Sequence, residues 1–406
     1  ANIIDAESFA DNIRAEGGTD IYRALQYACD LIPDNSNPTY LIFLTDGVPT
    51  VGNTNIEDIV KNTTSVNHDR ARLFVFGAGY DVNAHLLDRL AQENKGMSEY
   101  VQPNENIEVK ISRLAAKISS PALTDLSLSF GSIKSDLIYP APLPDLFFGS
   151  EIIITGRFHD TGNSQAIISG RINGDKVTYE FPVSFERGDS DDEFVSMLWA
   201  NRRIGYLLQQ IRLHGRSDEL LTEVIELSKR YGIITEFTSF LIAGDEYLAL
   251  NGDRNSPPPF LMDNSAASKS LADATDRLSS VQSGKSAVNQ SRALEAQKYA
   301  VQMPSPTMSG IEGKSNLNNI AQIGSQAFFQ SGENWIQGDL VGDKFDIEVE
   351  RYSKAYYQIL DKDPTLGRFL ALGETVRLKV GSQVMQISNA GKTELTNDEL
   401  KALFPN

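Results

Sequence analysis

The sequence of 406 residues predicts an α/β domain with a Rossmann-like parallel sheet, then a β-sandwich with a helical segment, a disordered linker and a small α+β domain. Two apolar runs, residues 40–44 and 73–76, lack alternation, which is typical of strands covered on both faces. Segments with helical spacing, residues 21–31 and 85–94, alternate with these runs. Beyond residue 121 the pattern changes to short alternating strands, which is typical of antiparallel sheets.

The α/β domain begins with the end of a helix, residues 8–15, and continues with the helix of residues 21–31. The sole cysteine, Cys29, lies on the apolar face of this second helix, so we expect it to be buried and unreactive. The strands at residues 40–44 and 73–76 and the helix at residues 85–94 follow, and a last helix at residues 106–118 closes the domain. This alternation is typical of the α/β class.

The region after residue 121 is predicted to be mainly β. The expected strands are residues 123–130, 150–158, 166–172 and 177–183. Two helices, residues 194–212 and 218–231, and a returning strand, residues 233–243, follow them. From residue 251 the sequence is rich in small and polar residues and Pro, which predicts a linker that cannot bury enough apolar surface to become ordered, with room for a helix at residues 287–300.

Charge and composition exclude several classes of partner. A formal net charge of −17 argues against nucleic acid, because sequence-independent affinity for phosphates comes from Lys and Arg. The same charge disfavours an anionic membrane surface. No apolar run approaches the ~20 residues that span a bilayer. With one cysteine there is no internal disulfide, so the sequence fits a reducing or an oxidising compartment alike.

Oxygen-bearing side chains stand in two loops of the α/β domain. Thr45, Asp46 and Gly47 follow the apolar strand, where a parallel sheet binds its ligands. The same tripeptide is equally common as a plain turn. The stretch Gly17-Gly18-Thr19-Asp20, just before a predicted helix, adds a second such loop and favours a binding site.

These loops give the chain a family resemblance over roughly its first 245 residues. The sequence resembles the second half of a von Willebrand factor type A domain, specifically that of the inter-alpha-trypsin inhibitor heavy chains, in which a preceding domain, the VIT domain, is expected. The motifs are Gly17-Gly-Thr-Asp-Ile21, Leu44-Thr-Asp-Gly47, Pro49-Thr-Val-Gly52, Phe76-Gly-Ala-Gly-Tyr-Asp-Val-Asn83, Phe147-Phe-Gly-Ser-Glu-Ile152, Leu198-Trp-Ala200 and Leu227-Ser-Lys-Arg-Tyr-Gly232. The C-terminal region resembles, more weakly, a domain found in bacterial relatives.

The resemblance implies a metal ion-dependent adhesion site, which binds Mg²⁺, or Mn²⁺ or Ca²⁺ in its place. Residue by residue, Thr19 and Asp46 match two of its ligand positions. The first ligand loop, Asp-x-Ser-x-Ser, has no match upstream, so we expect a chain that lacks the first strands of the domain and an incomplete site that holds the ion weakly or not at all. The remaining strands would then present an unpaired edge.

Other candidate site residues and motifs have weaker support from the sequence. Asp81 and Asn83 could extend the ligand face, although capping of the next helix is the better-supported role. The tripeptides Gly284-Lys-Ser286 and Gly313-Lys-Ser315 lack the preceding glycine of a phosphate-binding loop, so nucleotide binding is not expected. The histidines are scattered without metal-ligand spacing, and no nucleophile motif occurs, so no enzyme is predicted.

The sequence therefore predicts a non-enzymatic adhesion module that binds a protein ligand, through a carboxylate on that ligand, at a cation held by Thr19 and Asp46. The alternative is a scaffolding protein with metal-independent contacts. The expected domains are residues 1–118 (the C-terminal part of the type A domain), 119–188 (β-sandwich), 189–250 (helical segment and returning strand), 251–323 (linker) and 324–406 (small α+β domain).

Overall fold

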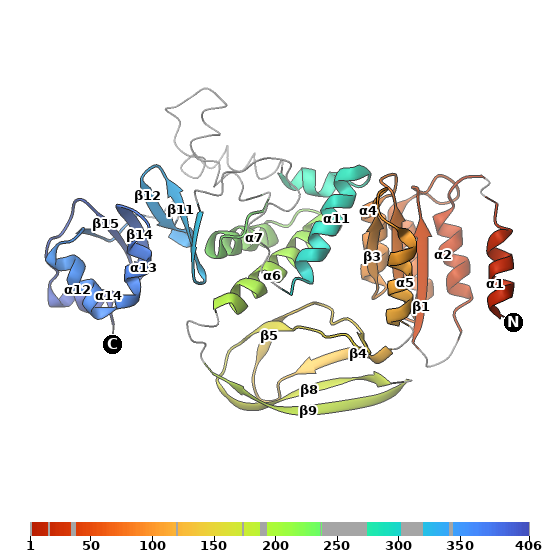
Figure 1. The fold of residues 1–406 in the computed structure, drawn as a ribbon, viewed down its shortest axis with the longest axis horizontal. Coiled ribbons are helices and arrows are strands. Elements are labelled where there is room, and N and C mark those ends of the chain that lie inside the picture. Colours follow the sequence, from red (N-terminus) through yellow and green to blue (C-terminus); the bar gives the residue numbers. More distant parts are fainter. Residues whose placement is uncertain are drawn as a thin grey trace, which may run out of the picture. The chain divides into compact units, whose positions relative to one another are not determined.

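The computed structural model describes residues 2–14, 17–33, 38–118, 121–172, 174–186, 193–235, 237, 274–301, 320–340 and 344–405 (Figure 1). These residues form two compact units. The first comprises residues 1–124, 171–176 and 282–288, and the second comprises residues 125–170, 177–281 and 289–406. No helix within the described ranges is long and apolar enough to cross a membrane.

The first unit is built on a parallel three-stranded sheet in the order β1-β2-β3. Its elements in chain order are α1 (Asn2–Asp11), α2 (Ile21–Asp30), β1 (Thr39–Thr45), α3 (Ile56–Asn67), β2 (Ala71–Ala78), α4 (Ala84–Glu93), β3 (Met97–Val101) and α5 (Ile107–Ile118). The parallel α/β class predicted from the sequence is confirmed.

Helices cover both faces of this sheet, as strand periodicity requires. Side chains at even positions of β1 and β2, such as Ile42 and Phe74, pack with Leu114 of α5. Side chains at odd positions, such as Leu41 and Ala71, pack with Cys29 of α2. Burial raises the pKa of the Cys29 thiol, which keeps it protonated and confirms the expected apolar role.

Strand β1 is an exception to the predicted burial. Whereas β2 is buried along nearly its whole length, every residue of β1 is at least partly exposed, and Leu44 is 46% exposed. The expectation of a strand buried on both faces was therefore wrong for β1. The physical reason is its position, since β1 pairs only with β2 among the described strands and forms the edge of the sheet. This unpaired edge agrees with the expectation drawn from the resemblance.

The second unit contains most of the short strands that the sequence predicts. Strands β4 (Pro121–Ser129), β6 (Leu146–Phe147), β8 (Gly162–Ile172) and β9 (Asp175–Phe185) form a sheet in the order β6-β4-β8-β9. Strands β5 (Ser135–Tyr139) and β7 (Thr155–Phe158) form an antiparallel pair. Two separate sheets thus occupy the region predicted to be a β-sandwich.

Two helices follow these sheets, α6 (Glu193–His214) and α7 (Asp218–Tyr231). Trp199 of α6 is buried beside Tyr139, and its indole nitrogen donates to the carbonyl of Leu137 at 3.0 Å. The predicted returning strand at residues 233–243 is not formed at residues 233–235, while residues 238–243 lie outside the described residues. Gly232 ends α7 in a left-handed conformation.

Part of the predicted linker is helical. Residues 274–280 form a helix and α11 spans Gly284–Lys298, which confirms the helix expected near residues 287–300 but corrects the linker prediction for residues 274–301. The reason is a small apolar face, since Ala274, Leu278 and Leu294 are buried with residues of α6 and α7. A few scattered apolar residues in this polar sequence are sufficient to pack the helices, because α6 and α7 provide an apolar partner face.

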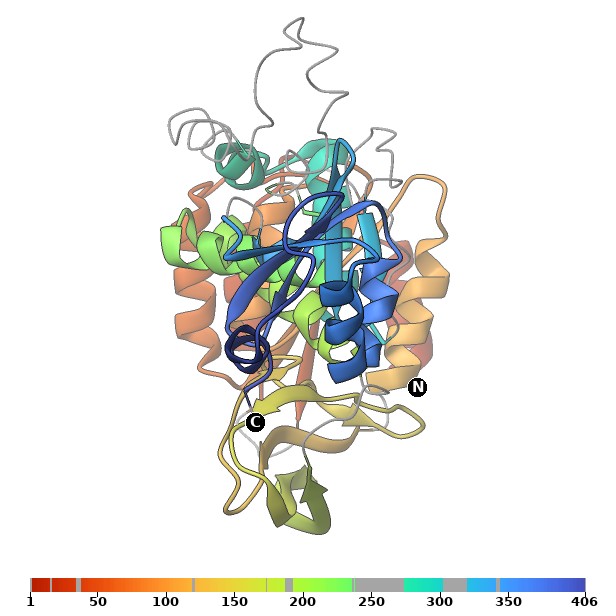
Figure 2. The ribbon, with the colours of Figure 1, turned by 90° about the vertical axis from the view of Figure 1, so that its left-hand side faces the viewer.

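The C-terminal module has a six-stranded mixed sheet in the order β10-β11-β12-β14-β15-β13, seen in blue in Figure 2. Its elements are β10 (Ile320–Ile323), β11 (Gln326–Ser331), β12 (Asn334–Gln337), η4 (Gly338–Leu340), β13 (Ile347–Glu350), α12 (Lys354–Lys362), η5 (Pro364–Leu366), α13 (Gly367–Leu370), β14 (Thr375–Val380), β15 (Gln383–Ser388) and α14 (Asn397–Leu403). The predicted α+β class is confirmed for this module.

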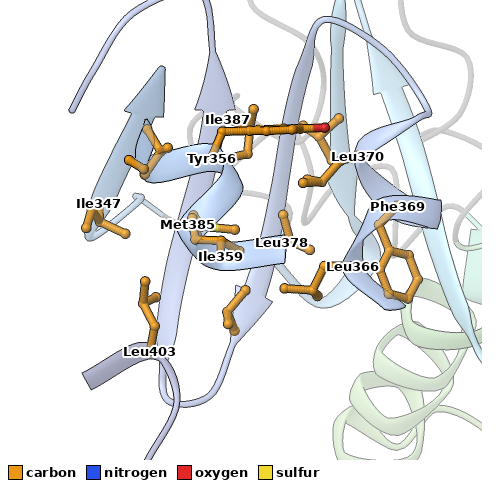
Figure 3. Packing of buried hydrophobic residues seen from close by; sticks show 14 of the residues in the cluster. Ile347, Tyr356, Ile359, Leu366, Phe369, Leu370, Leu378, Met385, Ile387 and Leu403 are labelled. Atoms are coloured by element: carbon orange, nitrogen blue, oxygen red, sulfur yellow. The ribbon is translucent and has the colours of Figure 1, made fainter. Parts of the chain in front are cut away.

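The core of this module lies between its sheet and its helices (Figure 3). Ile359 of α12 and Leu403 of α14 pack against Leu378, Met385 and other side chains of the central strands. Tyr356 belongs to this core, whereas its neighbour Tyr357 is exposed.

Candidate functional site

The two strand ends that carry predicted site residues lie side by side. β1 and β2 are parallel, and Thr45 at the end of β1 is in register with Gly77. Asp46 therefore leaves the sheet at the same edge as the loop that joins β2 to α4, residues 79–83. This edge is the carboxyl edge of the strands, where open α/β sheets bind ligands.

The loop that carries Thr19 is fixed against the loop that follows β1. The backbone N–H of Thr19 donates to the hydroxyl of Thr50 at 2.8 Å, and the N–H of Thr50 donates to the carbonyl of Thr19 at 2.9 Å. Val51 adds a third hydrogen bond to the same carbonyl at 3.3 Å. Thr50 belongs to the motif Pro49-Thr-Val-Gly52 but was not predicted as a site residue. Its role in joining the two loops had no signal in the sequence.

These bonds bring the hydroxyl of Thr19 close to the turn that contains Asp46. A Cβ atom added to Gly47 would lie 3.5 Å from the Oγ1 atom of Thr19. Thr19 is half-buried and Asp46 is exposed. The structure thus places the Thr19 hydroxyl beside Gly47, the residue that follows Asp46.

Close packing between the loops depends on glycine. Gly52 has a φ of +70°, and a Cβ there would stand 2.5 Å from the Oδ1 atom of Asp20. A Cβ on Gly18 would stand 2.1 Å from the Cγ2 atom of Val51. A larger residue at either position would force the neighbouring side chains to move, and at Gly52 it would also strain the backbone.

Two of the other predicted residues have structural roles at this edge. The carboxylate of Asp20 accepts from the N–H of Arg23 at 3.0 Å and caps the N-terminus of α2. The hydroxyl of Thr45 donates to the carbonyl of Gly47 at 3.1 Å and accepts from its N–H at 3.3 Å, which closes the turn. The Oδ1 atom of Asp20 and the Oγ1 atom of Thr45 therefore already make hydrogen bonds within the protein.

The β2–α4 loop contributes Asp81 and Asn83. The side-chain oxygen of Asn83 accepts from the N–H of Leu86 at 2.9 Å and caps α4, as the capping interpretation predicted. Asp81 is exposed. A segment far along the chain also reaches this loop, because Gly284 donates to the carbonyl of Tyr80 at 3.1 Å. The sequence offered no signal for that contact.

The electrostatic character of the edge favours a cation. The loops at residues 17–20, 45–52 and 77–83 contain Asp20, Asp46 and Asp81 and no Lys or Arg. One hydroxyl and one carboxylate fit a largely hydrated Mg²⁺, which keeps several waters among its ligands. Across the described ranges, no three His, Cys, Asp or Glu side chains gather closely enough to hold a metal ion. Any ion here would therefore be held by few protein ligands.

Comparison with known proteins gives a family match within the first unit. Residues 3–100 match the family of the von Willebrand factor type A domain. A solved structure of a von Willebrand factor type A protein from Catenulispora acidiphila aligns over 54% of this chain and 61% of that chain, with 15% identity and a TM-score of 0.37.

Curated relatives extend the match beyond the first unit. Inter-alpha-trypsin inhibitor heavy chain H4 from Homo sapiens is 29% identical over 262 residues, which cover 59% of this chain and 28% of the relative. Inter-alpha-trypsin inhibitor heavy chain H2 from Mus musculus is 26% identical over 293 residues, covering 66% of this chain and 30% of the relative. The chain thus spans less than a third of the length of these relatives.

Proposed function

We propose that this chain, which carries a von Willebrand factor type A domain and is related to the inter-alpha-trypsin inhibitor heavy chains, is a non-enzymatic protein-binding module that uses a divalent cation. The observation that carries the proposal is the pair of hydrogen bonds between Thr19 and Thr50, which holds the Thr19 hydroxyl beside the turn of Asp46. Type A domains commonly mediate protein interactions.

The chemistry of the edge supports this proposal. Thr19 supplies a neutral oxygen and Asp46 a carboxylate, and both are hard ligands of the kind that Mg²⁺, Mn²⁺ and Ca²⁺ accept. A cation held by two protein ligands retains exchangeable waters. A carboxylate on a protein partner can replace one of those waters and bind the ion directly.

Calorimetric titration of Mg²⁺ into the full chain tests the proposal. We expect weak saturable binding in the wild type and a loss of at least roughly tenfold in affinity in Asp46→Ala, because the only charged ligand is removed. Thr19→Val should also weaken binding, whereas Thr19→Ser keeps the hydroxyl and should preserve it. Asp30→Ala removes another exposed carboxylate, at the end of α2, and serves as the matched control.

Equal Mg²⁺ affinity in the wild type and Asp46→Ala would contradict the proposed site. The second candidate, a scaffolding role with metal-independent contacts, is favoured by the internal use of the Asp20, Thr45 and Asn83 oxygens, which leaves few ligands for an ion. It predicts no heat of Mg²⁺ binding in any variant and the same thermal stability in Mg²⁺ and in EDTA.

A further inference from the structure

A short segment of the chain lies on the β2–α4 loop of the first unit. We call residues 282–288 the strap. Ser283 forms an antiparallel bridge with Asn83, the N–H of Gly284 donates to the carbonyl of Tyr80 at 3.1 Å, and the N–H of His85 donates to the carbonyl of Gln282 at 3.3 Å. The strap therefore both donates a backbone hydrogen bond to the loop and accepts one from the start of α4, in the manner of an added strand.

The strap supplies a hydrogen-bond acceptor to the N-terminus of α4. The first N–H groups of a helix have no partner inside the helix. At α4 the side chain of Asn83 satisfies the N–H of Leu86, and the carbonyl of Gln282 satisfies the N–H of His85. A backbone carbonyl supplied by the strap thus completes the helix N-terminus, and a carbonyl from any other extended peptide could do the same.

Burial and charge also fit the strap to this unit. Its leading residues, Gln282 and Ser283, are exposed, whereas Ala287 and Val288 are fully buried. The strap contains Lys285 and no acidic residue, while the loops at this edge contain three aspartates and no basic residue. The loop therefore presents backbone groups for pairing in an acidic setting, which suits an extended segment that is neutral or basic.

We propose that the β2–α4 loop is a docking surface for an extended peptide segment. The strap occupies this surface in cis, and a neutral or basic segment of a protein partner binds there by displacing the strap. The pairing is made by backbone groups and needs no cation. Docking of a peptide at this loop is therefore independent of the proposed Mg²⁺ site. The tether gives the strap a high effective concentration, so a partner must compete with it.

The variant Gly284→Pro removes the N–H that donates to Tyr80. Proline is tolerated in the first position of a helix, so α11 can still form, but it cannot adopt the φ of +87° found at Gly284. Gly215 provides a matched control in the second unit. It has a φ of +89°, donates one backbone hydrogen bond, to Ile211 at 2.9 Å, and has open space around it as Gly284 does.

The experiment uses the full chain in EDTA, as wild type, Gly284→Pro and Gly215→Pro. Amide hydrogen exchange at His85 reports release of the strap. Fluorescence anisotropy reports binding of a labelled synthetic peptide with the sequence of residues 278–292. In Gly284→Pro we expect the His85 amide to exchange at least roughly tenfold faster than in the other two proteins, and the peptide to bind at least roughly tenfold more tightly.

Either of two results would overturn the proposal. His85 exchange that is unchanged in Gly284→Pro would mean that the bond to Tyr80 does not hold the strap in place. Faster exchange without tighter peptide binding than in Gly215→Pro would mean that the freed loop does not accept an extended segment in trans.

Discussion

Arg202 and Ala300 are joined by two hydrogen bonds, in which the Nε and Nη2 atoms of the guanidinium donate to one carbonyl oxygen at 2.9 and 2.8 Å. The Nη1 atom donates to the carbonyls of Tyr139 at 3.2 Å and Ile153 at 2.5 Å. The Arg202 side chain is almost fully buried, and this burial lowers its pKa. A single cation on α6 therefore gathers three distant backbone segments of the second unit.

The variant Arg202→Lys should destabilise the second unit by about 2–4 kcal/mol, because an ammonium group cannot reproduce the planar fork and leaves buried carbonyls without donors. Urea unfolding monitored by tryptophan fluorescence measures this difference, since Trp199 lies on the same helix. Arg216→Lys is the control, because Arg216 pairs with Asp218 at an exposed position and should change stability by less than about 0.5 kcal/mol. A loss in Arg202→Lys no larger than in this control would show that the carbonyl contacts contribute little.

The variant Gly52→Ala should cost more stability than Gly17→Ala, although both glycines have positive φ, of +70° and +80°. An added Cβ at Gly17 meets nothing within 4 Å, so that variant reports the cost of the backbone conformation alone, about 1 kcal/mol. At Gly52 the Cβ also displaces the Asp20 carboxylate and weakens the α2 cap, which adds about 1 kcal/mol. Thermal unfolding of the two variants gives the difference, and equal losses would mean that the Asp20 side chain moves aside without cost.

The variant Glu399→Gln should lower the melting temperature of the C-terminal module at neutral pH. The ion pair with Lys392 and the hydrogen bonds from the N–H and hydroxyl of Thr396 lower the pKa of Glu399 to about 2 from its usual 4.5. A carboxyl with a lowered pKa stabilises the folded state above its unfolded pKa, and this contribution disappears as the pH falls from about 4.5 to about 2. The wild type and the variant should therefore converge in acid.

Calorimetric scans of both proteins from about pH 2 to about pH 7, a range that includes this titration, measure the convergence. Glu394→Gln is a suitable control, since Glu394 pairs with Lys354 where both side chains are largely exposed. A difference between wild type and Glu399→Gln that stays constant across the range would contradict the assigned role of the charge.

Local signals were sufficient for many elements. The helix α7 spans the predicted residues because an N-cap serine, an apolar stripe and the C-terminal Gly232 mark it. The capping role of Asn83 and the burial of Cys29 also followed from neighbouring residues. The caps depend on contacts within a few residues, and the apolar face that holds Cys29 is a periodic pattern along one helix, which is why a single sequence carries these signals.

Predictions about burial were less secure. The apolar run in β1 resembles that of β2, yet β1 is partly exposed because burial depends on what lies beside a strand. The polar composition of residues 274–301 favoured a linker, yet α11 packs because a few apolar side chains meet α6 and α7. For β1 the deciding factor is its place at the edge of the described sheet, and for α11 it is a partner face far away in the sequence.

By itself the sequence determined the α/β class, the type A resemblance and the selection of Thr19 and Asp46, because these rest on local pattern and motif. Only the tertiary structure decided that Thr50 locks the two loops together and that residues 282–284 pair with the β2–α4 loop. Apart from the Thr50 hydroxyl, which accepts from the N–H of Thr19, those contacts are backbone hydrogen bonds across long separations in the chain. Backbone groups are the same in every residue except proline, so their pairing leaves no mark in the sequence and becomes visible only in the folded chain.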